Sequence, residues 1–238
     1  MNLSQAHTLY DAQEILTRLS NYYGPRPWYP RNEPLKELIQ TVLAQHTSDL
    51  NAERSFGALW NAFGSWDTIA NGDVAAIAES IRSGGLAQQK APRIRAILQE
   101  IFARRGDFAL EFLKELPFSE ALHWLTTLHG VGPKTARCVL LFALGFPCIP
   151  VDTHVHRVAR RLGLIGSRTT AEQAHDVLEG MVAPEQAYLF HVYLIEHGRK
   201  VCKAPRPRCP ECPLQQGCPS STVRFSVPSQ AAPPMVAR

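Results

Sequence analysis

The sequence has no apolar run long enough to cross a membrane, and its first residues lack the basic-then-apolar pattern of a signal peptide. The longest apolar run extends only from Val139 to Phe146. Charge of neither sign dominates, because 25 Lys and Arg residues accompany 21 Asp and Glu residues. We therefore expect a folded, soluble, intracellular protein without a membrane partner, and its 45% of hydrophobic residues is enough for a substantial core.

The sequence also lacks a convincing alternation of apolar and polar residues, which is the pattern of a half-buried β-strand. Apolar residues instead recur at helical spacing, with Gly, Pro and Ser between the periodic segments. This pattern predicts an all-α fold. The predicted helices cover residues 9–22, 34–44, 49–62, 73–83, 88–104, 119–128, 134–144, 152–162, 170–182 and 184–199.

The cysteines do not indicate a disulfide framework, because a reducing compartment keeps thiols free unless a metal binds them. Four of them lie close together as Cys202, Cys209, Cys212 and Cys218, among prolines that forbid a continuous helix. An irregular loop held by a metal centre is expected here. Four thiolates can bind an iron-sulfur cluster or a zinc ion, or they can be unrelated buried thiols, and the residues alone leave these alternatives open.

Residues 128–136 read LHGVGPKTA and predict a helix, a tight turn and a second helix that begins near Pro133. Gly130 and Gly132 permit close backbone approach, and the free amides of the second helix can bind a phosphate oxygen. Lys134 falls in the first turn of that helix, where the macrodipole disfavours a cation. A neutral lysine amine is a nucleophile that can form a Schiff base, although a turn of this kind is also common between ordinary helices.

Asp152 opens another predicted helix, in the segment VDTHVHR of residues 151–157. An Asp at this position is the natural N-cap of the helix, and capping alone explains its presence. A carboxylate that faces a cleft can also stabilise positive charge on a reacting group, and the two roles are compatible.

The segment 199–208 contains five basic residues and no acidic one. Such a cluster is either a solvated charged surface or a positive patch that binds phosphate.

These motifs, in this order and with a Cys-x6-Cys-x2-Cys-x5-Cys quartet, resemble the endonuclease III family of helix-hairpin-helix DNA glycosylases over about residues 10–220. The resemblance implies that the quartet holds a [4Fe-4S] cluster. It also implies a six-helix barrel domain over residues 32–146, and a second helical domain, formed by residues 1–31 and 147–222, that carries the cluster. Residues 223–238 show no amphipathic pattern and are expected to be a flexible tail.

The resemblance further implies a bifunctional DNA glycosylase and abasic-site lyase that removes oxidised pyrimidines of the thymine glycol type in base excision repair. Lys134 is then the nucleophile and Asp152 its partner carboxylate. The expected partner is double-stranded DNA with damaged bases or abasic sites, bound by a cytoplasmic monomer that associates with the nucleoid if the source is bacterial. The DNA-binding residues implied are Gln45 and Leu86 as wedges that fill the gap left by the extruded base, His154 in the base pocket, Gly130 and Gly132 in the hairpin, and Lys203 and Arg206 in the basic loop.

Two other functions are compatible with the sequence. A monofunctional glycosylase for uracil or thymine mismatches would use the same hairpin without Schiff-base chemistry. A non-catalytic DNA-binding module would use Lys134 only as a phosphate contact. Three features depart from the family pattern and bear on the lesion range: a loop around Gln45 that is a residue longer, Ala87 in place of a tyrosine, and Thr126 in place of a carboxylate.

Overall fold

The computed structural model describes residues 10–223, which contain eleven α-helices, five short 3-10 helices and no β-strand. The all-α prediction is confirmed for this part of the chain. None of its helices combines the length and the apolar character needed to span a bilayer. The α-helices are α1 (Ala12–Tyr23), α2 (Pro34–Leu43), α3 (Asp49–Phe63), α4 (Trp66–Asn71), α5 (Val74–Ser80), α6 (Ala87–Arg105), α7 (Phe118–Thr126), α8 (Pro133–Phe142), α9 (Thr153–Leu162), α10 (Ala171–Glu179) and α11 (Ala187–Lys200).

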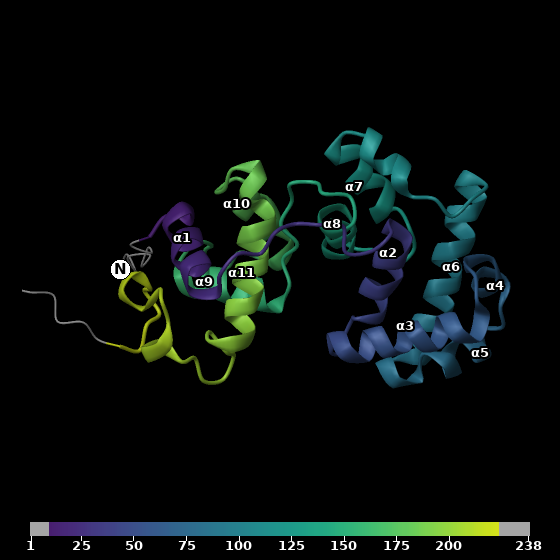
Figure 1. Ribbon diagram of the computed structural model, residues 1–238, viewed down its shortest axis with the longest axis horizontal. Helices are drawn as coiled ribbons and strands as arrows, with labels where there is room; N and C mark the ends of the chain where they lie inside the picture. Colours follow the sequence, from purple (N-terminus) through teal and green to yellow (C-terminus); the bar gives the residue numbers. More distant parts are fainter. Residues whose placement is uncertain (1–9, 224–238) are drawn as a thin grey trace, which may run out of the picture.

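The helices form two lobes, each with its own hydrophobic core (Figure 1). The core of the first lobe uses buried residues between Leu35 and Cys148, from α2 to α8 and the segment after it. The core of the second lobe combines α1 with residues between Ile149 and Leu214, including α9, α10 and α11. These two cores support the predicted division into two domains, which stays a prediction.

Local signals explain where many of the helices begin. Six helices start at a Ser, Thr or Asp whose side chain accepts a hydrogen bond from a first-turn amide, which satisfies a donor that the helix itself leaves unpaired. Two others, α2 and α8, start with proline at the first helical position. The cap residues are Asp11, Ser48, Ser65, Asp73, Asp152 and Thr170.

Some predicted boundaries are wrong. Helix α4 was not predicted, and the helix predicted over 73–83 ends at Ser80 and continues as a 3-10 turn over Arg82–Gly84. The chain after Lys200 contains only two 3-10 turns up to residue 223, as the prolines predict. Of the predicted tail, residues 224–238 lie outside the described residues.

Candidate functional site

A cavity of about 650 Å³ lies between the two lobes. Its volume is in the range of sites that enclose a small organic ligand. Lys134 and Asp152 both line it, although 18 positions separate them in the sequence (152 − 134). The other lining side chains include the aromatic Tyr29, Phe142 and Tyr188, the polar Gln40, Thr41 and His191, and the charged Arg31, Asp49, Glu53 and Arg199.

Lys134 is held at the cavity by the start of α8. Gly132 is the N-cap in an extended conformation, and Pro133 takes the first helical position. Lys134 is therefore the second residue of the helix, and its side chain is half-buried. One turn further along α8, the buried thiol of Cys138 also lines the cavity. Burial raises the pKa of Cys138, and its charge interaction and hydrogen bond with Lys134 oppose that rise. The lysine therefore has a defined neighbour on its own helix.

The predicted hairpin is confirmed as a turn between α7 and α8. Gly130 has a φ of 77°, in the left-handed region that favours glycine, and is exposed. Gly132 is also exposed, and a Cβ built on it would meet no atom within 4 Å. Open backbone at the start of a helix is the geometry that a phosphate needs for close approach.

Asp152 caps α9 as predicted. Its Oδ1 accepts hydrogen bonds from the amides of His154, at 2.9 Å, and Val155, at 2.7 Å. Both bonds use the same oxygen, so the cap leaves Oδ2 available to other partners. The carboxylate thus combines a rigid position with a place on the cavity wall.

His191 of α11 is a cavity residue that the sequence did not reveal. Its ring is only 2% exposed, and its buried Nδ1 has no hydrogen-bond partner in the described part of the chain. Burial lowers the pKa of His191 to about 4, and the nearby carboxylate of Asp152 opposes this shift while Lys134 reinforces it. The site therefore contains a neutral imidazole near both Lys134 and Asp152.

We expect His191 to make folding stability depend on pH. The free energy of unfolding contributed here is full above pH 6.5, the ordinary pKa of His, and is lost as the pH falls toward 4, because the unfolded ring takes up a proton that the folded ring refuses. The loss is on the order of 3 kcal/mol. The free energy of unfolding, measured by urea titration at several pH values in this range, should change less with pH in His191→Phe than in the wild type. The surface variant His123→Phe should retain the wild-type pH dependence. The same pH dependence of stability in all three proteins would contradict this assignment.

The two predicted wedge residues lie in loops with unusual backbone. Leu86 has a φ of 53°, and His46, which follows Gln45, has a φ of 57°. They are the only non-glycine residues with positive φ between residues 10 and 223. Leu86 is 45% exposed rather than packed inward, and Gln45 is half-buried. Strained backbone that presents an apolar side chain to solvent is typical of functional loops.

Lys90 joins the two wedge loops and was also missed from the sequence. Its side chain is 2% exposed, and its Nζ donates to the carbonyls of Leu43, at 2.7 Å, and Gly84, at 3.0 Å. One of these carbonyls precedes the loop of Gln45 and the other precedes Leu86. Burial lowers the pKa of Lys90, with a smaller effect from Arg93.

The structure does not bring His154 to the cavity wall. Its Nδ1 lies 3.1 Å from Nη2 of Arg157, and its Cβ packs against Gly198 of α11. A role in the base pocket therefore stays a prediction.

The basic segment 199–208 divides into paired and unpaired cations. Arg199 pairs with Asp49 at 2.7 Å, Lys200 with Glu196 at 2.7 Å, and Arg208 with Glu211 at 3.6 Å. Lys203 and Arg206 are exposed and belong to no ion pair of the described residues. Among the cations of this segment, these two have charge free for another partner.

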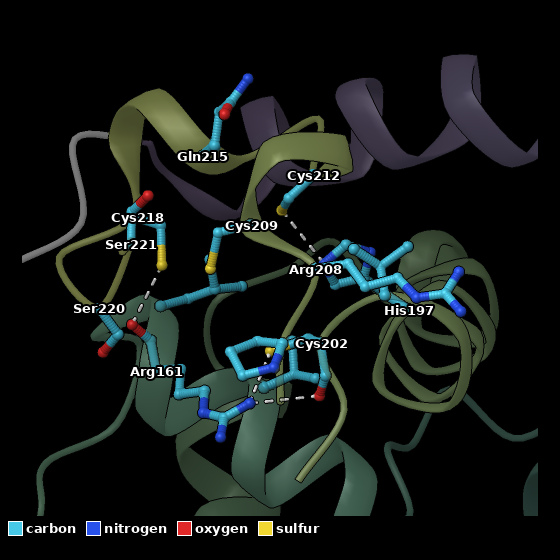
Figure 2. A pocket seen from close by; sticks show the side chains of 14 residues that line it. Arg161, His197, Cys202, Arg208, Cys209, Cys212, Gln215, Cys218, Ser220 and Ser221 are labelled. Atoms are coloured by element: carbon cyan, nitrogen blue, oxygen red, sulfur yellow. Dashed lines mark hydrogen bonds between the residues drawn. The ribbon is translucent and has the colours of Figure 1, made fainter. Parts of the chain in front are cut away.

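The cysteine quartet lines a single pocket in the second lobe, and Figure 2 shows the four thiols around it. Two N–H groups point at sulfur atoms: Nη1 of Arg161 lies 3.4 Å from Sγ of Cys202, and the Leu214 amide lies 3.4 Å from Sγ of Cys212. The Leu214 amide favours the thiolate form of Cys212. Burial nevertheless raises the pKa of Cys212 to about 12, so without a cationic centre this thiol keeps its proton.

No group of three or more His, Cys, Asp or Glu residues between positions 10 and 223 is arranged to hold a metal ion. The two remaining cysteines, Cys138 and Cys148, are buried in the first lobe.

Known proteins are similar to this chain in both sequence and fold. A family model described as "HhH-GPD superfamily base excision DNA repair protein" matches residues 39–184. Endonuclease III of Thermotoga maritima is 34% identical over 197 residues, which cover 80% of this chain and 86% of the relative. A candidate DNA glycosylase of Arabidopsis thaliana is 36% identical over 168 residues, or 71% of this chain, and these span only 57% of that longer protein.

Solved structures agree with this assignment. A trapped covalent intermediate of endonuclease III with DNA, described as an estranged-adenine complex, has a TM-score of 0.76 and 27% identity and covers 89% of this chain and 97% of its own. A thermostable thymine-DNA glycosylase has a TM-score of 0.70 at 20% identity, covers 88% of this chain and 95% of its own, and shows the fold alone. The chain belongs to the endonuclease III family, within the HhH-GPD superfamily of base excision DNA repair proteins.

Proposed function

We propose that this DNA glycosylase is bifunctional, removing oxidised pyrimidines of the thymine glycol type and cleaving the strand through a Schiff base on Lys134. The observation that carries the proposal is that the Lys134 amine and the Asp152 carboxylate line one cavity of about 650 Å³ between the lobes. A nucleophile and a carboxylate at one cavity are what attack on a sugar carbon requires.

The reaction begins when the neutral Lys134 amine attacks C1′ of the damaged nucleotide. The bond between C1′ and the base breaks, and the base leaves with the electron pair and takes up a proton. Asp152 stabilises the positive charge that develops on the sugar. Opening of the sugar ring gives a Schiff base between Lys134 and C1′. Loss of a proton from C2′ then expels the 3′ phosphate by β-elimination.

The DNA contacts follow from the exposed elements around the cavity. We propose that the hairpin of Gly130 and Gly132 binds a phosphate through the free amides at the start of α8, and that Lys203 and Arg206 bind others with their unpaired charge. Gln45 and Leu86 would fill the space from which the damaged base is extruded. The expected partner is therefore duplex DNA with a damaged base or an abasic site, bound by a monomer.

We propose that Cys202, Cys209, Cys212 and Cys218 hold a [4Fe-4S] cluster. The shared pocket and the N–H groups aimed at sulfur support this choice. The quartet lacks the two short Cys pairs usual in zinc modules, and together with the resemblance to the endonuclease III family this spacing favours a [4Fe-4S] cluster over a single zinc ion. When bound, the cluster would shape the loop that carries Lys203 and Arg206.

Loss of one thiol should therefore empty the site. Purified wild-type protein should contain iron and acid-labile sulfide in equal amounts, and Cys209→Ser should lose both together with part of its resistance to urea. Cys138→Ser changes a thiol of the other lobe and should keep its iron. Zinc in place of iron, or full metal content in Cys209→Ser, would refute the cluster assignment.

The lesion class is tested with four duplexes, which contain thymine glycol, uracil opposite guanine, thymine opposite guanine, or no lesion. We expect strand cleavage at thymine glycol without added alkali. Release of uracil or thymine from a mismatch duplex, with the strand intact until alkali is added, would indicate a monofunctional mismatch glycosylase. Equal binding to all four duplexes without any reaction would indicate a non-catalytic DNA-binding module.

A further inference from the structure

Arg93 of α6 lies where the loop of Gln45, the hairpin and the helix of Lys134 meet. Its Nη1 donates to Oε1 of Gln45 at 2.8 Å. A Cβ built on Gly130 would lie 2.6 Å from Cδ and Nε of Arg93, so the arginine side chain lies directly against the hairpin. A side chain at position 130 would displace it.

The contact with Arg93 fixes which way the Gln45 amide faces. A guanidinium group has only donors, so it can bond the carbonyl oxygen of the amide and never its nitrogen. The other end of the amide, Nε2, lies 3.4 Å from Oγ1 of Thr135, the residue that follows Lys134. Because the amide nitrogen carries two hydrogens, one N–H remains after this contact.

We propose that Arg93 is the positioning residue of the Gln45 wedge. It engages the amide carbonyl, so that Gln45 enters the duplex with an N–H donor available to the base left unpaired. This inference rests on the proposed function, because only there is Gln45 a wedge. It adds that the wedge is oriented before DNA arrives, which lowers the ordering cost of insertion.

An arginine near DNA could instead act as an ordinary phosphate contact. The two roles differ in their dependence on Gln45. A phosphate contact acts independently of Gln45, whereas a positioning residue acts only through it. A double-mutant cycle separates the two cases, because coupled residues show non-additive effects.

The test uses a duplex with a tetrahydrofuran abasic analogue opposite 2-aminopurine, whose fluorescence reports unstacking when a wedge enters. Affinity is measured for this duplex relative to an undamaged one. Arg93→Ala should lower the ratio of the two affinities by roughly tenfold, which is the effect of one charge-assisted hydrogen bond. Arg93→Lys, which keeps a donor, should recover part of the loss, and Arg93→Ala should have no further effect in a Gln45→Ala background.

Arg95→Ala is the matched control, because it removes the same charge from α6 at a residue that bonds the Ala70 carbonyl rather than Gln45. If Arg93→Ala matches Arg95→Ala, or if its effect is unchanged without Gln45, the inference is wrong. The analogue cannot form a Schiff base, so the outcome does not depend on chemistry at Lys134. Absence of a covalent adduct on a true lesion would overturn the proposed function and leave the cycle interpretable.

Discussion

Replacing Asp152 by Asn should slow base removal by about 10²- to 10³-fold and leave α9 intact. Asn caps a helix about as well as Asp, so the amides of His154 and Val155 keep their acceptor. What Asn lacks is the negative charge that stabilises a cationic sugar. Single-turnover cleavage of a thymine glycol duplex measures the rate, and urea unfolding measures the fold.

Asp73 provides the matched control for Asp152. It caps α5 in the same way, accepting from the Ala76 amide at 3.0 Å, but it does not line the cavity. Asp73→Asn should therefore leave the cleavage rate unchanged. If Asp152→Asn cleaves at the wild-type rate, Asp152 is only a cap and the proposed mechanism is wrong.

Replacing Lys90 by Met should lower the free energy of unfolding by about 2 kcal/mol or more, because the carbonyls of Leu43 and Gly84 lose their buried donor. Removing the desolvated ammonium offsets part of this cost. Because the same bonds hold both wedge loops, we also expect weaker discrimination between abasic-site and undamaged duplexes. Urea unfolding and comparative DNA binding measure the two effects.

Lys114→Met is a suitable control, since Lys114 is exposed and its replacement should change stability by no more than about 0.5 kcal/mol. Two outcomes for Lys90→Met would contradict the assignment. One is stability equal to that of Lys114→Met, and the other is a loss of stability with unchanged preference for the abasic-site duplex, which would confine Lys90 to a purely structural role.

Features that depend on local sequence were predictable. The cap at Asp152, the turn at Gly130 and the irregular chain after Lys200 all arise from side chains and backbone within a few residues. Helix α4 was missed because its six residues are too few to show a full amphipathic period.

Features that depend on contacts between distant segments were not predictable. Lys90 bonds a carbonyl 47 positions away and Arg93 an amide 48 positions away, and neither has a local signal. In the sequence, His191 is an ordinary polar residue of an amphipathic helix, and only the packing of α11 places it on the cavity wall. Only the resemblance to a known family selected Gln45 and Leu86, and their wedge roles stay predictions; the positive φ and the exposed side chain of Leu86 are what the structure adds.

Borohydride reduction of the protein with a thymine glycol duplex tests the central claim most directly. A Schiff base on Lys134 would be reduced to a stable covalent adduct, and peptide mapping of the adduct should locate the DNA at Lys134. The wild type should form this adduct and Lys134→Ala should not, although both bind the duplex. An adduct that persists in Lys134→Ala, or no adduct from a folded wild type that releases the base, would contradict the account.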